Sequence, residues 1–157
     1  MTCDNSCLLN FTDIVMTKHD IRFGDWAALG ADAKTIRFEV FVEEQKVPAE
    51  LEMDDMDAVC LHAVAYDAAG IPIGTGRLLP DGHIGRMAVR AGGRGTGIGG
   101  ALLQSLMAQA RARGDLQVVL SSQSHAAPFY LRHGFVVEGD EFFEAGIAHI
   151  NMRHVFA

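Results

Sequence analysis

Residues 84–106 read IGRMAVRAGGRGTGIGGALLQSL and combine three signals of local structure. Residues 84–90 predict a short strand, because Ile, Met, Ala and Val dominate them. Residues 91–97 contain four glycines and predict a loop. Apolar residues then recur at helical spacing from Ile98 to Leu106. This order predicts an anion-binding cradle, because the first N–H groups of a helix lack partners and glycines let the backbone approach a phosphate closely.

Two familiar phosphate loops fit this stretch poorly. A Walker loop needs Gly-Lys-Ser/Thr where the helix begins, and residues 84–106 contain no lysine. A dinucleotide-binding loop needs Gly-x-Gly-x-x-Gly, which Gly95, Gly97 and Gly100 supply. It also needs an acidic residue about 20 residues further on, and residues 118–122 offer none.

A third pattern, Arg/Gln-x-x-Gly-x-Gly/Ala, is met by Arg94, Gly97 and Gly99. It resembles the acetyl-CoA loop of the GNAT-family N-acetyltransferases. Residues 123–135, QSHAAPFYLRHGF, resemble the other half of that family's site. There a polar residue is followed by Ala, an aromatic-Tyr pair on a short helix, and Gly-Phe.

Two further stretches resemble a subgroup of small GNAT proteins: VFVEEQ at residues 40–45 and GIAHI at residues 146–150. The resemblance covers about residues 14–152. It implies an α/β (α+β) fold, with a mixed, mostly antiparallel central sheet and helices on both faces.

Local patterns predict elements that agree with this fold. Residues 116–120 form an apolar run, which predicts a buried strand parallel to the one at 84–90. The expected strands lie at 14–17, 21–23, 59–67, 71–79, 84–90, 116–120, 135–138 and 148–154, and the expected helices begin at Trp26 behind the cap Asp25 and span 97–113 and 126–133.

Length and composition predict one domain over residues 12–157 behind a loose tail at 1–11. The net charge of −7 argues against nucleic acid and anionic membranes as partners. Three cysteines are too few for a disulfide scaffold, and the first residues lack a signal-peptide pattern, so we expect a cytoplasmic protein. We expect no metal and no membrane helix.

The resemblance implies acetyl-CoA as the co-substrate. Main-chain N–H groups of residues 87–89 would polarise the thioester carbonyl, and Gln123 stands where the family commonly has asparagine. The residues expected to contact acetyl-CoA are Met87, Ala88, Val89, Arg94, Gly95, Thr96, Gly97, Ile98, Gly99, Gly100, Gln123, Ala126, Phe129 and Tyr130.

Acetyl transfer to an amine also needs proton transfers. Tyr130 matches the family's tyrosine near the sulfur, where a phenol donates a proton to the departing thiolate. The alternative is that Tyr130 is a packing aromatic. Candidates for the base are Glu43, Glu44, His62 and His83. Glu43 and Glu44 also fit a solvated helix end, and His62 fits a structural role in a strand.

The sequence therefore predicts an acetyl-CoA-dependent N-acetyltransferase that acts by direct transfer in a ternary complex. The acceptor would be a small-molecule or peptide amine. The alternative is a non-catalytic acyl-CoA-binding or sensor module. The acidic run at residues 50–57 fits either attraction of a cationic acceptor or a solvated loop. The apolar strands near the end would suit a homodimer.

Overall fold

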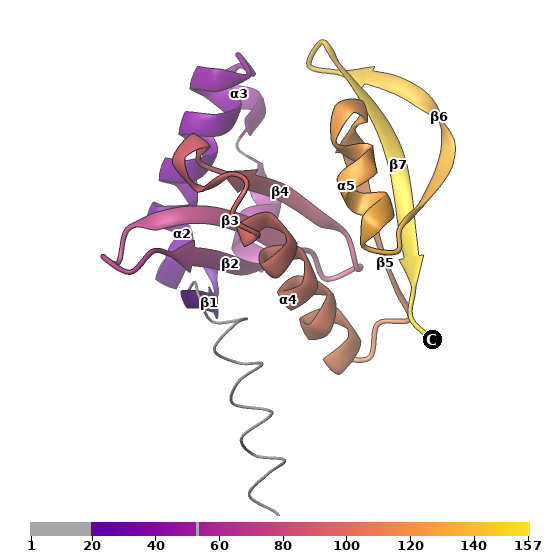
Figure 1. The fold of residues 1–157 in the computed structure, drawn as a ribbon, viewed down its shortest axis with the longest axis horizontal. Helices are drawn as coiled ribbons and strands as arrows, with labels where there is room; N and C mark the ends of the chain where they lie inside the picture. The colour runs from indigo at the N-terminus through magenta and orange to yellow at the C-terminus, as the bar shows by residue number, and fades with distance from the viewer. Residues whose placement is uncertain (1–19, 53) are drawn as a thin grey trace, which may run out of the picture.

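The computed structural model describes residues 20–52 and 54–157, which form two β-sheets with helices packed on them (Figure 1). The expected tail at 1–11 and the expected strand at 14–17 lie outside the described residues. The elements are β1 (Asp20–Gly24), α2 (Trp26–Arg37), the π-helical segment η1 (Phe38–Glu44), α3 (Ala49–Glu52), η2 (Asp55–Val59), β2 (Leu61–Tyr66), β3 (Pro72–Leu78), β4 (Ile84–Val89), η3 (Ala91–Gly93), α4 (Ile98–Ala112), β5 (Gln117–Gln123), η4 (Ser124–Ala126), α5 (Ala127–Arg132), β6 (Val136–Glu144) and β7 (Ile147–Val155).

The first sheet has the strand order β1-β2-β3-β4, with each neighbouring pair antiparallel. Its strand β2 is buried on both faces. Ala63 and Ala65 pack in the cluster around α4, whereas Val64 and Tyr66 pack in the cluster around α2. This alternation places one helix on each face of the sheet, as predicted.

Helix α2 begins where the sequence predicted. The Asp25 carboxylate accepts a hydrogen bond from the Ala28 N–H at 2.9 Å and so caps the helix. Leu29, Ala33 and Ile36 are buried at three- and four-residue spacing against the sheet. The chain then continues into η1, so the helical segment extends to Glu44.

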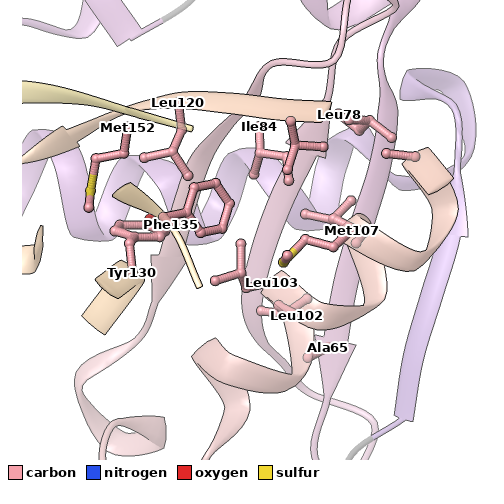
Figure 2. Close-up of a cluster of buried hydrophobic side chains, with 14 of the residues drawn as sticks. Ala65, Leu78, Ile84, Leu102, Leu103, Met107, Leu120, Tyr130, Phe135 and Met152 are labelled. Atoms are coloured by element: carbon pink, nitrogen blue, oxygen red, sulfur yellow. The ribbon is translucent and has the colours of Figure 1, made fainter. Parts of the chain in front are cut away.

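Helix α4 covers the opposite face of the first sheet. The residues that the helical spacing singled out are all buried, and Figure 2 shows part of the cluster they form with β4, β5 and α5. They are Ile98, Leu102, Leu103, Leu106 and Ala110. Gly114 follows the helix at φ +100°, a left-handed conformation that suits glycine after a helix end.

The second sheet has the order β5-β7-β6 and is antiparallel throughout. The sequence predicted that the strand after α4 would lie parallel to β4. His83, directly before β4, does form a parallel bridge with Val119 of β5, but that bridge is isolated. The two sheets therefore diverge beyond it.

Strand β4 contains a bulge that the sequence did not reveal. Arg77 faces Gly85 and Thr75 faces Ala88, so Arg86 and Met87 together oppose one residue of β3. Because of this extra residue, the side chains on the two sides of the bulge no longer follow one regular alternation between the faces of the sheet.

Ile84 and Ala88 are four residues apart and would share a face in a regular strand. Instead Ile84 packs with α4 and Ala88 packs with α2. The bulge therefore decides which side chains of β4 face which helix.

Several predicted boundaries were wrong at exposed positions. Leu116 is 82% exposed and precedes β5 instead of starting a buried strand. Strand β6 extends beyond the strand expected at 135–138 as far as Glu144, and the chain then turns at Ala145 and Gly146. Strand β6 is an exposed sheet edge, so its polar residues hide the apolar alternation that marks a strand. Within the described ranges, no helix is both long and apolar enough to cross a membrane.

Candidate functional site

A cleft of about 790 Å³ opens where β4 and β5 diverge. Its wall also includes η1, the end of α3 and the turn between β6 and β7. Nine of the residues predicted for catalysis or cofactor binding line it: Met87, Ala88, Val89, Arg94, Gln123, Ala126, Tyr130, Glu44 and His83. Residues far apart in the sequence are thus brought to one place.

The glycine loop meets the start of α4 with exposed backbone. Gly97 precedes the helix at φ +87°, and no side chain caps the first turn. A Cβ added at Gly92, Gly95 or Gly97 would meet no atom within 4 Å. The Thr96 hydroxyl donates to the Gly93 carbonyl and closes the loop. Uncapped N–H groups beside an open glycine backbone fit the binding of a pyrophosphate.

None of the predicted residues 95–100 is part of the cleft wall, and two of them, Gly99 and Gly100, lie on α4 itself and have a packing role. A Cβ at Gly99 would lie 3.6 Å from the Phe129 ring, and one at Gly100 would lie 3.2 Å from the His133 ring. Phe129 is also outside the cleft wall and packs against Tyr130 with ring centroids 5.0 Å apart. Gly100 therefore allows α5 to approach α4 closely.

Arg94 is held by an ion pair across the mouth of the cleft. Its two terminal nitrogens each donate to Glu44 at 2.8 Å, and its Nε donates to the Val89 carbonyl at 2.9 Å. The hydrogen bonds from Arg94 lower the pKa of the Glu44 carboxyl. The predicted pyrophosphate ligand and a predicted base are thus each other's partners.

Tyr130 lines the cleft and its side chain is buried. It packs edge-on against Phe129 and Phe135. Burial raises the pKa of Tyr130 to about 12. The phenol therefore stays protonated at neutral pH and is available as a hydrogen-bond donor.

Gln123 ends β5 and is joined across the cleft to Gln45, which follows η1. Gln123 donates to the Gln45 side-chain oxygen at 2.7 Å, and Gln45 donates back at 3.3 Å. This amide pair bridges the two sides of the cleft. His149 faces it from β7, with its ring stacked on Phe142.

The structure separates the four candidate bases. Glu44 and His83 line the cleft, whereas Glu43 is exposed and His62 is buried in the first sheet. His62 interacts with the Asp57 carbonyl at 2.9 Å, and burial lowers its pKa. The structural interpretation of His62 therefore fits its surroundings.

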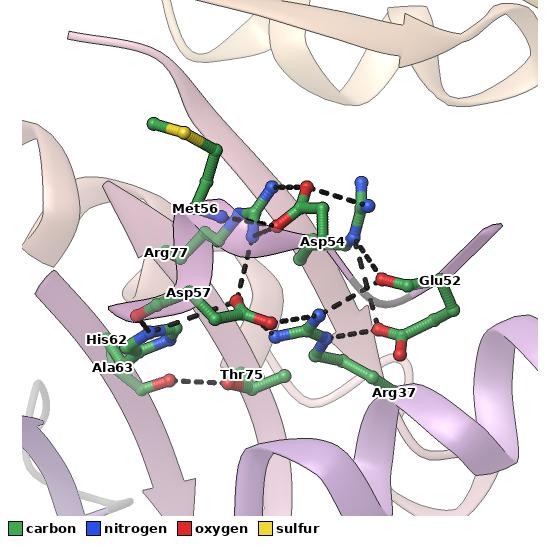
Figure 3. Close-up of polar contacts among 10 residues, drawn as sticks. Arg37, Glu52, Asp54, Met56, Asp57, His62, Ala63, Thr75 and Arg77 are labelled. Atoms are coloured by element: carbon green, nitrogen blue, oxygen red, sulfur yellow. Dashed lines mark hydrogen bonds and ion pairs between the residues drawn. The ribbon is translucent and has the colours of Figure 1, made fainter. Parts of the chain in front are cut away.

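The acidic run has a third role that neither interpretation anticipated. Three of its carboxylates and three arginines form a cluster on the α2 face of the first sheet, which we call the acid–arginine cluster (Figure 3). Its members are Glu52, Asp54, Asp57, Arg37, Arg77 and Arg86.

Asp57 is the centre of this cluster. It accepts from Arg37 at 2.9 and 3.0 Å and from Arg77 at 2.7 Å. Burial alone would raise the pKa of Asp57, but the hydrogen bonds from the two arginines outweigh it and lower the pKa. Asp54 accepts from Arg77 at 2.8 and 2.7 Å, and Glu52 accepts from Arg37.

The cluster corrects the sequence interpretation of these acids, because Glu52 and Asp57 are buried. Their carboxylates are buried and paired with arginines of this chain, so they neither face solvent nor are free to bind a cationic acceptor. A signal was present in the sequence. Arg37, Arg77 and Arg86 each interrupt an apolar segment, and their positive charges could pair with the carboxylates of the acidic run. An arginine inside an apolar strand requires a buried partner.

No group of three or more His, Cys, Asp or Glu side chains within residues 20–52 and 54–157 has an arrangement suited to a metal ion.

Comparisons with known proteins agree on one family. The acetyltransferase (GNAT) domain family matches residues 27–156. The uncharacterized N-acetyltransferase YjcF of Bacillus subtilis is 40% identical over 125 residues, which are 77% of this chain and 89% of that protein.

Solved structures show the same likeness. An acyl-CoA N-acyltransferase of Pseudomonas aeruginosa is 34% identical, with a TM-score of 0.76 over 87% of this chain and 99% of its own. Escherichia coli ElaA has the same TM-score and coverage at 24% identity, which is a likeness of fold.

Proposed function

Because the chain belongs to the GNAT family of acetyltransferases and is an acyltransferase, we propose that it moves an acetyl group from acetyl-CoA to a primary amine. The transfer is direct, with both substrates bound together. Among the described residues that line the cleft there is no cysteine to carry the acetyl group.

One observation carries this proposal. A single cleft contains the open edge of β4, Arg94 beside the glycine loop, and Tyr130. These groups have the chemistry that the two ends of the reaction require: donors for an anion and a carbonyl at one side, and a proton donor at the other.

The reaction exchanges one bond for another. Acetyl-CoA supplies a thioester, whose carbonyl carbon is attacked by the amine nitrogen. The C–N bond forms as the C–S bond breaks, the nitrogen gives up one proton, and the sulfur leaves as a thiolate that takes up a proton.

The chain's own groups assist each stage. The first turn of α4 and Arg94 bind the pyrophosphate. Main-chain N–H groups of residues 87–89 donate to the carbonyl oxygen as its charge grows, and one such donor contributes about 3 kcal/mol in a dry site. Tyr130 donates a hydrogen bond to the departing sulfur.

The attacking amine must lose a proton before it reacts, since an alkyl ammonium with a pKa near 10 has no lone pair. Glu44 faces the cleft and is the better placed of the two predicted carboxylates. While Glu44 is paired with Arg94 it is a weak base, because the pairing lowers its pKa. If Arg94 bound a pyrophosphate instead of Glu44, its hydrogen bonds would no longer lower the pKa of Glu44. Glu43 or a water molecule is the alternative.

Two measurements test the proposal. Calorimetry with acetyl-CoA measures binding, and release of free CoA thiol in a screen of amines, polyamines, aminoglycosides and peptides measures transfer. We expect binding together with thiol release that depends on an amine. Binding with no amine-dependent release from any acceptor would contradict the enzyme and favour a non-catalytic acyl-CoA-binding module.

A further inference from the structure

One charged side chain of the acid–arginine cluster, that of Arg86, is partly exposed on the cleft wall. Glu52, Arg77 and Arg86 all line the cleft. Their side chains are 3%, 6% and 28% exposed, respectively. Of these three side chains, a ligand in the cleft would therefore meet chiefly that of Arg86; Asp54, which is 34% exposed and also accepts from Arg86, is not part of the cleft wall.

Arg86 is also the most loosely held arginine of the cluster. Its Nε donates to the Glu52 carbonyl at 3.1 Å and its Nη2 to Asp54 at 3.3 Å. Its nearest approach to the Glu52 carboxylate is 3.9 Å. Arg77, in contrast, makes three carboxylate contacts of 2.7–2.8 Å. Burial lowers the pKa of Arg86, so an added anion would stabilise its charged form.

The backbone fixes where this charge lies. Arg86 has φ +49° at the bulge of β4, a conformation that costs free energy in a residue other than glycine and that the surrounding contacts must hold. Arg86 directly precedes Met87 in the bulge, and both residues line the cleft beside Ala88 and Val89 of the open edge of β4. An anion on Arg86 is thus held close to the proposed reaction centre.

The other carboxylates of the cleft wall do not neutralise Arg86. Glu44 is paired with Arg94 at the mouth. Glu144 is exposed on the turn between β6 and β7. The wall otherwise includes apolar side chains, among them Phe41, Val47 and Leu51.

We propose that Arg86 binds a carboxylate of the acceptor, so that the acceptor is an amine that also carries a carboxylate, on an apolar body. This inference rests on the proposed acetyl transfer and names the acceptor class for it. A guanidinium matches a carboxylate in geometry as well as in charge.

Matched acceptors test the inference. Phenylalanine is compared with phenethylamine, and an ω-amino acid with the alkylamine of equal length, by kcat/KM for thiol release. We expect the carboxylate to raise kcat/KM about tenfold to a hundredfold, the range of a charged hydrogen bond. Equal kcat/KM for both members of each pair would overturn the inference and leave the acetyltransferase intact.

Variants assign the effect to one residue. Arg86→Gln should remove the preference for the carboxylate while retaining acetyl-CoA affinity, and Arg86→Lys should restore part of it. Lys34→Gln removes one exposed positive charge on α2 and is the matched control. A preference that survives Arg86→Gln would contradict the assignment. If Arg86→Gln does not fold, Arg86→Lys is compared with the wild type, because it keeps the charge but loses the planar fork of the guanidinium. A reduced preference for the carboxylate then supports the assignment, and an unchanged preference contradicts it.

Product binding separates this inference from the proposed function. N-acetylphenylalanine and N-acetylphenethylamine are titrated into CoA-saturated protein, without any catalysis. Tighter binding of the carboxylate product, lost in Arg86→Gln, supports the inference even if no amine is acetylated. Equal binding of the two products contradicts it.

Discussion

Arg94 on the glycine loop and Glu44 at the end of η1 form a two-pronged ion pair across the mouth of the cleft, with both hydrogen bonds at 2.8 Å. The pair joins the glycine loop, which is the proposed pyrophosphate site, to the end of η1. If Arg94 binds the pyrophosphate as proposed, it must leave Glu44, and cofactor binding would then be coupled to the release of this carboxylate.

Glu44→Gln should therefore strengthen acetyl-CoA binding, because Arg94 loses its competing partner and a negative charge leaves the site. Both side chains are partly exposed, so we expect a gain of about two- to fivefold, measured by calorimetry at low salt. Glu43→Gln is the control, since Glu43 is an exposed neighbour of the same charge. Unchanged or weaker affinity in Glu44→Gln would show that the pair does not compete with the cofactor.

Arg94→Ala should weaken CoA and dephospho-CoA binding by the same factor, about tenfold, because the pyrophosphate is common to both. The loss should shrink as salt is raised, since the side chain is partly exposed. A loss confined to CoA would instead assign Arg94 to the ribose phosphate.

The glycines offer a test of the loop, and the structure decides which substitution is informative. Gly97 has φ +87°, so any side chain there costs about 1 kcal/mol of stability whatever it does to binding. Gly99 has an ordinary helical backbone, and a Cβ would lie 3.6 Å from Phe129. Gly99→Val should thus fold, and because Gly99 packs on Phe129 outside the cleft wall, it should lower acetyl-CoA affinity only if the helix start approaches the pyrophosphate. A folded variant with unchanged affinity would remove Gly99 from the site.

Elements with strong local patterns were predictable from the sequence. The Asp25 cap, the apolar spacing of α4 and the turn between β2 and β3 depend on residues that lie close together in the chain. Of the strand, glycine loop and helix, residues 87–89 and Arg94 do line the cleft, whereas the helix start lies outside its wall and stays a predicted pyrophosphate site.

Features that depend on distant partners were not predictable. The bulge at Arg86 is visible only from the register of β4 against β3. The burial of Glu52 and Asp57 depends on Arg37 and Arg77, which lie in other elements. A charged residue considered alone in the sequence predicts a solvent-exposed position. Only pairing with a partner that is distant in the sequence makes a buried position tolerable.

The acid–arginine cluster should make stability depend on pH. Hydrogen bonds from Arg77, with the charge of Arg86, lower the pKa of Asp54 from 3.8 to about 2. The ionised carboxylate therefore stabilises the fold above about pH 4, and this stabilisation is lost as the pH falls through about 2. Asp54→Asn keeps the oxygen that caps the Met56 N–H but removes the charge.

We expect Asp54→Asn to lower the free energy of unfolding by about 1 kcal/mol at neutral pH, after allowance for the partial exposure of the side chain. Denaturant unfolding should also show a shallower loss of stability between about pH 4 and pH 2. Asp55→Asn, at an exposed neighbour, should change neither. An unaltered pH dependence in Asp54→Asn would show that Arg77 and Arg86 do not perturb this carboxyl.

Tyr130→Phe should retain acetyl-CoA affinity and lower turnover, because the ring still packs against Phe129 and Phe135 while the hydroxyl is lost. We expect a loss of about a hundredfold, the lower end of what a positioned proton donor contributes. Since burial raises the pKa of Tyr130 to about 12, the phenol stays protonated over the ordinary assay range. The pH–rate profiles of the two proteins should therefore run parallel below about pH 10, two units under that pKa. The test needs an acceptor from the amine screen. Wild-type turnover in Tyr130→Phe would reduce Tyr130 to a packing residue and leave the thiolate to be protonated by water.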